Sequence, residues 1–269
     1  MQNSQSVSLT IAGSDSGAGA GVQADLKTFA AFGVYGISTI TAITSQNTMG
    51  VHDALELPPQ IIATQLDALA ADFQINAIKI GMLSSTPIIE TVVSKIKEYQ
   101  LENIIVDPVM VAKGGDHLLR PDAVNSLISS LLPLALVVTP NAHEAEVLTS
   151  RKINTLDDAK YAAEAIYGLG ARNVVVKGGH FGEDATDIFF DGAEFFQFSS
   201  PRVHTQSTHG TGCTLSSAIA SCIALEKPIY DSIRIAKNYV YNAILNAIPI
   251  GHGHGPLNHF HNLENQPNK

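Results

Sequence analysis

The chain has 269 residues, of which 45% are hydrophobic, so it can bury a full core, and this length suits one large domain better than two small ones. Its net charge of −9 argues against a protein that mainly holds nucleic acid or an acidic membrane surface. The N-terminus carries no secretory signal and no apolar stretch reaches transmembrane length, so we expect a cytoplasmic protein.

Patterns typical of strands and helices alternate along the chain. A short buried strand is predicted at 7–13, and the glycine-rich turn after it leads into helical spacing over 22–29. Further strands are predicted at 37–44, 77–80, 104–106, 136–139 and 174–177, separated by helices near 59–72, 86–99, 121–131 and 155–169. Such alternation predicts an α/β fold in which helices cover both faces of a parallel sheet.

The pattern changes in the last third of the chain. Between 186 and 198, two short strands flank Asp191-Gly192, which predicts a hairpin late in the sheet or at its edge. Two helices follow, beginning near Gly212 and Pro228. The remaining Gly/His/Pro/Asn-rich residues read as a flexible polar tail.

Polar residues and glycines follow the predicted strands. In open α/β sheets ligands bind beyond the carboxyl ends of the strands, so these positions are where we expect the functional site. They are Gly13-Ser14-Asp15, Ser45-Gln46-Asn47, Gly81-Met82, Asp107-Pro108-Val109, Pro140-Asn141 and Gly178-Gly179-His180.

The common phosphate-binding motifs are not matched. Segment 13–21 is rich in glycine, but the third glycine of a dinucleotide-binding turn would fall on Val22. The Lys27-Thr28 pair follows Leu26, where a Walker A motif needs glycine. The glycines can equally form an ordinary tight turn between a strand and a helix.

The segment 208–216, Thr-His-Gly-Thr-Gly-Cys-Thr-Leu-Ser, is a stronger candidate for an anion site. Glycines let the backbone approach a phosphate closely, and the N–H groups at the start of a helix add partial positive charge. A Gly/Thr helix cap without a ligand would give the same pattern. The two cysteines, Cys213 and Cys222, indicate neither a disulfide framework nor a zinc site and fit a reducing compartment.

Taken together, eight segments closely resemble the hydroxymethylpyrimidine and phosphomethylpyrimidine kinases of thiamine biosynthesis, in the ribokinase-like family. The segments are 13–21, 23–28, 79–82, 107–110, 139–144, 177–180, 209–214 and 253–259. The resemblance covers about 7–261 and implies a single ribokinase-like domain over 1–269, a three-layer αβα sandwich with a mostly parallel sheet. It also implies ATP and Mg²⁺ as cofactors and two successive phosphorylations of 4-amino-5-hydroxymethyl-2-methylpyrimidine.

The resemblance implies a role for each residue of the anion segment. Gly210, Thr211 and Gly212 would form the anion hole, and Cys213 would be the base that activates the substrate hydroxyl, with His209 able to assist. Related sugar kinases carry aspartate at the position of Cys213. A thiol is a weak base unless its pKa is lowered, which a helix N-terminus favours. The alternative is that Cys213 is a small buried hydrophobe.

The same matching implies a site for the nucleotide and metal. Asp107 and Glu144 would orient hydrated Mg²⁺, which prefers oxygen ligands. Asn141, Lys177 and Thr208, with Gly210 and Gly212, would bind the donor nucleotide, and Lys177 would also act in catalysis. Alternatively, Lys177 is a solvated lysine at a strand end, and Glu144 caps a helix.

For the substrate, the resemblance places Gln46 against the pyrimidine. A primary amide offers a donor beside an acceptor, which matches the amino group and ring nitrogen of an aminopyrimidine edge. Met82 and Val109 would supply apolar faces, and Gly13, Asp15 and Ala18 would line the first turn. Plain core packing would also explain Met82 and Val109.

Several alternatives stay open. A pyridoxal kinase of the same fold is the nearest, although cysteine-using pyridoxal kinases carry a further cysteine where this chain has Ala112. A non-catalytic pyrimidine sensor, or a metal-binding protein that uses His252, His254, His259 and His261, belongs to another class. We expect a homodimer by default, and the segment 111–119 is a plausible lid.

Overall fold

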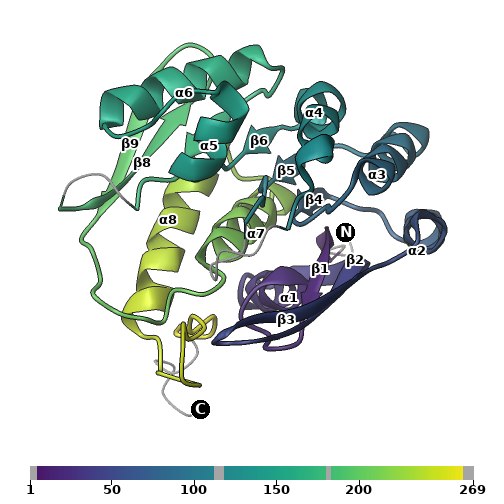
Figure 1. Ribbon diagram of the computed structural model, residues 1–269, viewed down its shortest axis with the longest axis horizontal. Helices are drawn as coiled ribbons and strands as arrows, with labels where there is room; N and C mark the ends of the chain where they lie inside the picture. Colours follow the sequence, from purple (N-terminus) through teal and green to yellow (C-terminus); the bar gives the residue numbers. More distant parts are fainter. Residues whose placement is uncertain (1–4, 112–117, 180–182, 263–269) are drawn as a thin grey trace.

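The computed structural model describes residues 5–111, 118–179 and 183–262, and within them nine strands form one sheet in the order β3-β2-β1-β4-β5-β6-β7-β8-β9 (Figure 1). From β2 to β7 all neighbouring strands are parallel, whereas β3, β8 and β9 pair antiparallel. The strands are β1 (Val7–Asp15), β2 (Tyr35–Asn47), β3 (Gly50–Glu56), β4 (Ala77–Ile80), β5 (Ile104–Val106), β6 (Val137–Val138), β7 (Val174–Val176), β8 (Ala185–Phe190) and β9 (Phe195–Ser200).

Helices cover both faces of this sheet and bury a separate apolar cluster on each. One cluster contains side chains of α2 (Pro59–Asp72), α3 (Thr86–Glu98), α5 (Ala142–Thr149) and α6 (Leu156–Gly168). The other contains side chains of α1 (Gly21–Ala31), α7 (Thr211–Ala224) and α8 (Ile229–Leu245). Because both faces are covered, every residue of β4, β5 and β7 is buried, and these strands are apolar throughout except for Lys79 in β4. The predicted three-layer αβα architecture is confirmed.

Most predicted elements are present, and the predicted hairpin forms β8 and β9 at one edge of the sheet. Two elements were missed, β3 and α5. Strand β3 has no buried residue and lies at the opposite edge, so it lacks the apolar signal of a core strand. The predicted helix at 121–131 is broken into short 3₁₀, α and π turns, namely Pro121–Ala123, Val124–Ser126, Leu127–Leu131 and Leu132–Leu134.

The expectation of a flexible tail is wrong for the part of it that the structure describes. Residues 251–261, which we call the C-terminal strap, pack against the rest of the protein. His254 N–H donates to the carbonyl oxygen of Thr48 at 2.9 Å, just beyond β2, and His209 N–H donates to the carbonyl oxygen of Gly255 at 3.0 Å. His259 is only 3% exposed. The strap therefore bridges the β2–β3 turn and the segment before α7.

Two expectations about other partners can be compared with the described residues. Across the described ranges, no helix is both long and apolar enough to cross a membrane. In the same ranges, no three His, Cys, Asp or Glu side chains gather closely enough to hold a metal ion. The histidines of the strap thus do not form a metal cluster there.

Candidate active site

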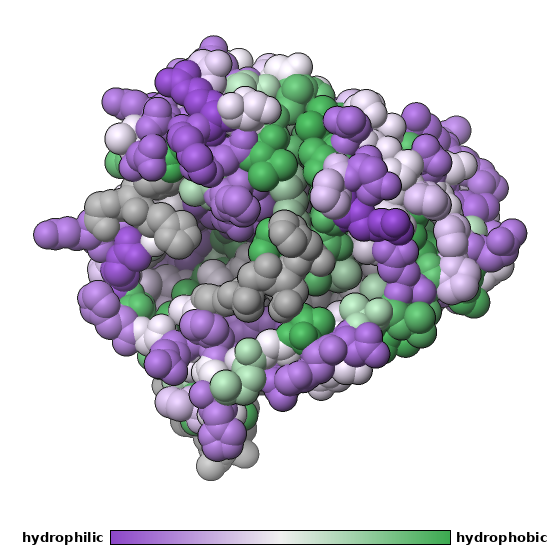
Figure 2. All heavy atoms as spheres, in the orientation of Figure 1, coloured by the Kyte–Doolittle hydropathy of each residue, from purple (hydrophilic) through white to green (hydrophobic). Residues whose placement is uncertain are grey.

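A cavity of about 1240 Å³ lies at the carboxyl ends of the parallel strands. On the face shown in Figure 2, hydrophilic residues predominate around the rim, and hydrophobic residues are visible in the hollowed part. Nearly all the predicted site residues line the cavity: Gly13, Asp15, Gln46, Met82, Asp107, Val109, Asn141, Glu144, Lys177, Thr208, Gly210, Thr211, Gly212 and Cys213. The strand-end rule therefore brings residues from the whole length of the chain to one site.

Ala18 is the exception among the predicted residues, because it is not part of the cavity lining. It lies on the turn between β1 and α1 with a φ of 58°, and its carbonyl oxygen accepts a hydrogen bond from Lys27 at 2.8 Å. Ala18 therefore lies on the first turn, as the resemblance implies, but outside the cavity lining.

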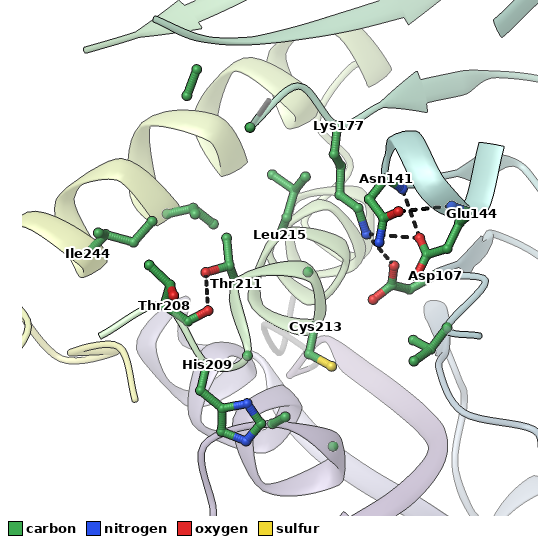
Figure 3. Close-up of a pocket in the computed structure, with 18 of the residues that line it drawn as sticks. Asp107, Asn141, Glu144, Lys177, Thr208, His209, Thr211, Cys213, Leu215 and Ile244 are labelled. Atoms are coloured by element: carbon green, nitrogen blue, oxygen red, sulfur yellow. Dashed lines mark hydrogen bonds and ion pairs between the residues drawn. The ribbon is translucent and has the colours of Figure 1, made fainter. Parts of the chain in front are cut away.

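The anion segment forms the start of α7. Gly210 has a φ of 84°, and a Cβ there would collide with the carbonyl oxygen of Gly19, so the turn requires glycine. Thr211 braces the turn by donating its hydroxyl to the carbonyl oxygen of Thr208 at 2.7 Å. The N–H groups of a first helical turn have no acceptor within the helix. Gly212 and Cys213 belong to that turn and line the cavity, as anion binding requires (Figure 3).

The Cys213 side chain lies at the edge of the anion segment (Figure 3). Burial raises the pKa of the thiol to about 11, although the nearby Lys79 ammonium and a hydrogen bond from the backbone of Gly21 act in the opposite direction. The expected lowering of this pKa by the helix N-terminus is therefore not found in the free protein. Cys222 is fully buried in α7, as predicted for a packing residue.

Asp107, Glu144 and Lys177 form a charged cluster beside the anion segment (Figure 3). The Nζ atom of Lys177 lies 2.7 Å from Oδ1 of Asp107 and 3.7 Å from Oε2 of Glu144. The two carboxylates are 1% and 4% exposed. A Cβ on Gly212 would lie 3.1 Å from Nζ of Lys177, so glycine lets the backbone of α7 approach this cluster.

The pKa values in this cluster follow from the burial of two carboxyl groups beside one lysine ammonium. Burial raises the pKa of Glu144 to about 7 with some help from the Asp107 carboxylate, even though the Lys177 ammonium lowers it. Burial disfavours the charge on Lys177, but the two carboxylates outweigh it and raise its pKa above the usual value. Lys177 is thus an enclosed ion-pair partner, and the solvated alternative does not hold.

Asn141 and Glu144 together cap α5. The Asn141 side chain accepts the N–H of Glu144 at 2.9 Å, and Oε2 of Glu144 accepts the N–H of Asn141 at 2.8 Å. The helix-cap alternative for Glu144 is therefore confirmed, and the same oxygen faces Lys177. Capping therefore fixes the Glu144 carboxylate at the cavity wall.

The residues present fit a hydrated magnesium ion. Asp107 and Glu144 supply hard oxygen atoms, and with Lys177 between them the carboxylates exceed the cations, so a further cation is favoured. Two carboxylates match the habit of Mg²⁺, which keeps several waters and uses few protein ligands.

The opposite end of the cavity holds Asp15, Gln46 and His209. Nε2 of His209 lies 2.9 Å from Oδ2 of Asp15 and 3.3 Å from the side-chain nitrogen of Gln46. Gln46 comes from the end of β2, whereas His209 precedes the anion turn by one residue. The side-chain amide of Gln46 and the anion segment therefore lie side by side, as the predicted reaction needs.

Sequence reasoning missed a buried ion pair below the cavity. Nζ of Lys79 lies 2.9 Å from Oδ2 of Asp25, and both side chains are fully buried. Asp25 also accepts the hydroxyl groups of Thr10 at 2.6 Å and Ser217 at 2.7 Å. Lys79 lines the cavity near Cys213. A charged residue inside an otherwise apolar strand was the available signal.

An apolar lobe of the cavity was also missed. Leu215 of α7 and Ile244 of α8 line the cavity beyond the anion segment (Figure 3), and Val240 of α8 also belongs to the cavity lining. In the sequence these residues are ordinary core positions of amphipathic helices, so nothing distinguished them. Three of the earlier expectations, on Ala112, on His180 and on most of the lid at 111–119, lie outside the described residues.

Comparisons with known proteins show the family to which the chain belongs. The profile of the phosphomethylpyrimidine kinase family matches residues 15–258. The chain is 49% identical over 254 residues to the hydroxymethylpyrimidine/phosphomethylpyrimidine kinase of Bacillus subtilis. The aligned region covers 94% of each chain.

Two solved structures extend the likeness to the fold. The phosphomethylpyrimidine kinase of Clostridium difficile is similar with a TM-score of 0.79 and 46% identity, over 88% of this chain and 99% of that one. An ADP complex of Bacillus subtilis pyridoxal kinase is similar with a TM-score of 0.91 and 38% identity, and the match covers 97% of this chain and 100% of that one. The family profile and the near full-length identity decide the assignment, and the chain belongs to the phosphomethylpyrimidine kinase family.

Proposed function

We propose that this protein transfers the γ-phosphoryl group of ATP to the hydroxymethyl group of 4-amino-5-hydroxymethyl-2-methylpyrimidine, and then phosphorylates the monophosphate to the diphosphate. The observation that carries the proposal is that Gln46 and the anion segment meet in one cavity, with 3.3 Å between Gln46 and His209. A ring held by the amide has its hydroxymethyl arm within reach of the first turn of α7.

In this proposal the amide of Gln46 binds the amino group and the adjacent ring nitrogen. Met82 and Val109, which line the same cavity, contact the faces of the ring. Asp15 and Gly13 form the wall at the end of β1. Gly13 keeps this wall open, since a Cβ there would lie 3.1 Å from the sulfur of Met82.

The donor phosphates bind at the other side of the anion segment. Backbone amides of Gly210, Thr211 and Gly212 stabilise the negative charge of the phosphoryl group in transfer, as in an oxyanion hole, where losing one donor costs about 3–4 kcal/mol. Lys177 lies beside this turn and contacts the same phosphates, with Asn141 and Thr208 at the margins. The apolar lobe around Leu215 and Ile244 has the chemistry to hold an adenine ring.

Asp107 and Glu144 would hold Mg²⁺ through its water shell. When bound, the ion would neutralise charge on the donor phosphates. Lys177 would share the two carboxylates with the ion.

In its thiolate form Cys213 accepts the proton of the substrate hydroxyl in the first transfer and becomes the neutral thiol. The second acceptor is a phosphate that is already ionised at neutral pH, so that transfer needs little help from a base. Both cysteines are free, which fits a reducing compartment, and we propose the cytoplasm as the location.

Mass spectrometry of the pyrimidine alcohol incubated with the protein and MgATP tests the proposal directly. One and two phosphate additions are expected. Cys213→Ala should slow the first addition by roughly 100-fold and leave the second much less affected, given the usual contribution of a general base. Absence of any phosphorylated pyrimidine with the unaltered protein would contradict the proposed function.

A pyridoxal kinase activity is the second candidate, because the chain is similar over 97% of its length to pyridoxal kinases of Bacillus subtilis and Staphylococcus aureus. The two substrates are both hydroxymethyl heterocycles, and discrimination between them rests on few buried hydrogen bonds. Values of kcat/KM for both alcohols, measured under the same conditions, would rank them. A higher value for pyridoxal would overturn the pyrimidine assignment.

We also propose that two copies associate through the edge of the sheet. Strand β3 ends the strand order, and Met49 and Leu55 at this edge are both 65% exposed. Light scattering should give twice the mass of the chain, and Leu55→Asp should lower it. A monomer at micromolar concentration would contradict this proposal.

A further inference from the structure

The side-chain amide of Gln46 lies between two polar groups that fix its orientation. On one side its oxygen is 3.0 Å from the hydroxyl of Thr44, and on the other its nitrogen is 3.3 Å from Nε2 of His209. A half-turn about the bond to the amide exchanges oxygen and nitrogen at nearly the same positions. The hydrogen-bonding needs of Thr44 and His209 therefore decide whether the amide oxygen or the amide nitrogen faces each of them.

Thr44 has a single hydroxyl proton, and it already donates this proton to the backbone carbonyl oxygen of Ser14. The hydroxyl lies 3.0 Å from the carbonyl oxygen of Ser14, which can only accept. With the amide oxygen of Gln46 also facing Thr44, two acceptors would compete for one proton. With the amide nitrogen facing Thr44, the hydroxyl donates to Ser14 and accepts from Gln46, so all groups are satisfied.

His209 gives the same answer independently. Oδ2 of Asp15 lies 2.9 Å from Nε2 of His209 and also accepts the backbone N–H groups of Gly19 at 3.1 Å and Ala20 at 2.9 Å. This oxygen is therefore an ionised acceptor, and the proton between it and the ring must be on Nε2. An Nε2–H group cannot accept from the NH₂ of Gln46, so that orientation sets two donors against each other, whereas an amide oxygen on that side can share the Nε2 proton with Asp15 in a three-centre hydrogen bond.

We propose that Asp15, through His209, holds Gln46 with its amide oxygen toward His209 and its NH₂ toward Thr44, and that this order selects the substrate edge. The proposal rests on the proposed function in so far as it names what Gln46 discriminates. His209 is thus a positioning residue for specificity. Burial opposes ionisation of Asp15, but the hydrogen bonds from His209 and the backbone hold its pKa below the usual value. This direction agrees with an ionised Asp15 that accepts the proton of Nε2.

The fixed order leaves one lone pair of the amide oxygen and one amide N–H for the ligand. A 4-aminopyrimidine edge complements them, because its amino group donates to the oxygen and its ring nitrogen accepts the N–H. In the 4-oxo analogue both groups are reversed, since the carbonyl accepts and the adjacent ring N–H donates. Binding it would turn Gln46 and leave two donors facing each other at His209.

The ratio of kcat/KM for the 4-amino alcohol to that for the 4-oxo alcohol measures this selection. We expect His209→Ala and Thr44→Val each to lower the ratio by roughly 10- to 100-fold, the worth of one unsatisfied buried polar group. Thr44→Ser keeps the hydroxyl and should keep the ratio, and so should His52→Ala, which removes an exposed histidine of β3. A purely structural defect would lower both values together and leave the ratio unchanged, which would overturn the proposal.

The tautomer of His209 tests the same orientation without catalysis. Long-range ¹H–¹⁵N NMR of the unaltered protein, assigned by the signal that His209→Ala removes or by His209→Gln if that variant does not fold, should find a proton on Nε2. A bare Nε2 with the proton on Nδ1 would overturn the proposal. Should the unaltered protein phosphorylate neither alcohol, the proposed function would fall, and the tautomer would still decide the orientation of Gln46.

Discussion

The Nζ atom of Lys177 lies 2.7 Å from Oδ1 of Asp107, although 70 residues separate them in the chain. Both follow strand ends of the same sheet, and Glu144 completes the cluster at 3.7 Å from the lysine. One cation thus serves two buried carboxylates at the position where donor phosphates are proposed to bind. The cluster is stable in the free protein because the lysine balances part of the negative charge.

Replacement of Lys177 by alanine should therefore affect both activity and stability. Phosphoryl transfer should fall by at least about 100-fold, since a donor to the transferring group is lost. The free energy of unfolding should fall by about 3–5 kcal/mol, the usual cost of leaving a buried charge unpaired. Urea unfolding with and without Mg²⁺ measures this, and Mg²⁺ should stabilise the variant more than the unaltered protein.

The matched control is Lys152→Ala, because Lys152 pairs with Glu146 on the surface, where its side chain is 81% exposed. Exposed pairs contribute little, so activity and unfolding should barely change. Equal effects of the two substitutions would contradict the role given to Lys177.

The raised pKa of Cys213 predicts a pH dependence of the first phosphorylation. With a thiol pKa of about 11 in the folded protein, the thiolate is scarce at neutral pH and increases about tenfold per pH unit up to that value. If the thiolate is the base, kcat/KM for the alcohol should rise with pH between 7 and 9. The Cys213→Ala variant should lose this slope, and a slope that persists in it would assign the titration to another group.

His259 of the C-terminal strap predicts a pH dependence of stability. Burial lowers its pKa from 6.5 to about 4, so between these values the unfolded chain binds a proton that the folded protein does not. The contribution of His259 to stability is thus complete above pH 6.5 and is lost as pH falls toward 4, with a total on the order of 3 kcal/mol.

Urea unfolding between pH 7 and 4.5 measures this contribution. His259→Gln should flatten the pH dependence and also lower stability at pH 7, because the contact between Nε2 and the Thr214 hydroxyl at 3.1 Å is disturbed. His52→Ala, at an exposed site, should keep the slope of the unaltered protein. An unchanged slope in His259→Gln would mean that other groups cause it.

The Asp25–Lys79 pair predicts a non-additive pattern of substitutions. Lys79→Met should destabilise the protein by about 3–5 kcal/mol, because Asp25 is then buried without its cation. The double variant Asp25→Leu, Lys79→Met should be less destabilised than the single one, since no buried charge remains. If the double variant lost as much free energy of unfolding as the two single variants lose together, this coupling would be contradicted.

Much of the fold could be predicted from the sequence, for physical reasons. Strands β4 and β5 were predicted with their observed bounds because a strand covered on both faces is a mainly apolar run between turns, interrupted here only by Lys79 in β4. The same rule failed for β3, whose residues are all partly or fully exposed. The position of β3 depends on pairing with β2, which no local pattern records.

The site could be predicted where residues follow strand ends and not where tertiary packing decides. Asp107 and Gln46 were found because their strands end at the same edge of the sheet. The partnership of Lys79 with Asp25 depends on how α1 lies against β4, which is a relation between elements distant in sequence. The raised pKa of Cys213 also follows from burial and not from its position at a helix start.

The C-terminal strap has a consequence for biosynthesis. It contacts Thr48 beside the β2–β3 turn and, through His259, the hydroxyl of Thr214 in the first turn of α7. Translation proceeds from the N-terminus, so every strand of the sheet leaves the ribosome before these residues do. The nascent chain can thus assemble its scaffold first, while the catalytic pocket acquires its final support only near the end of synthesis.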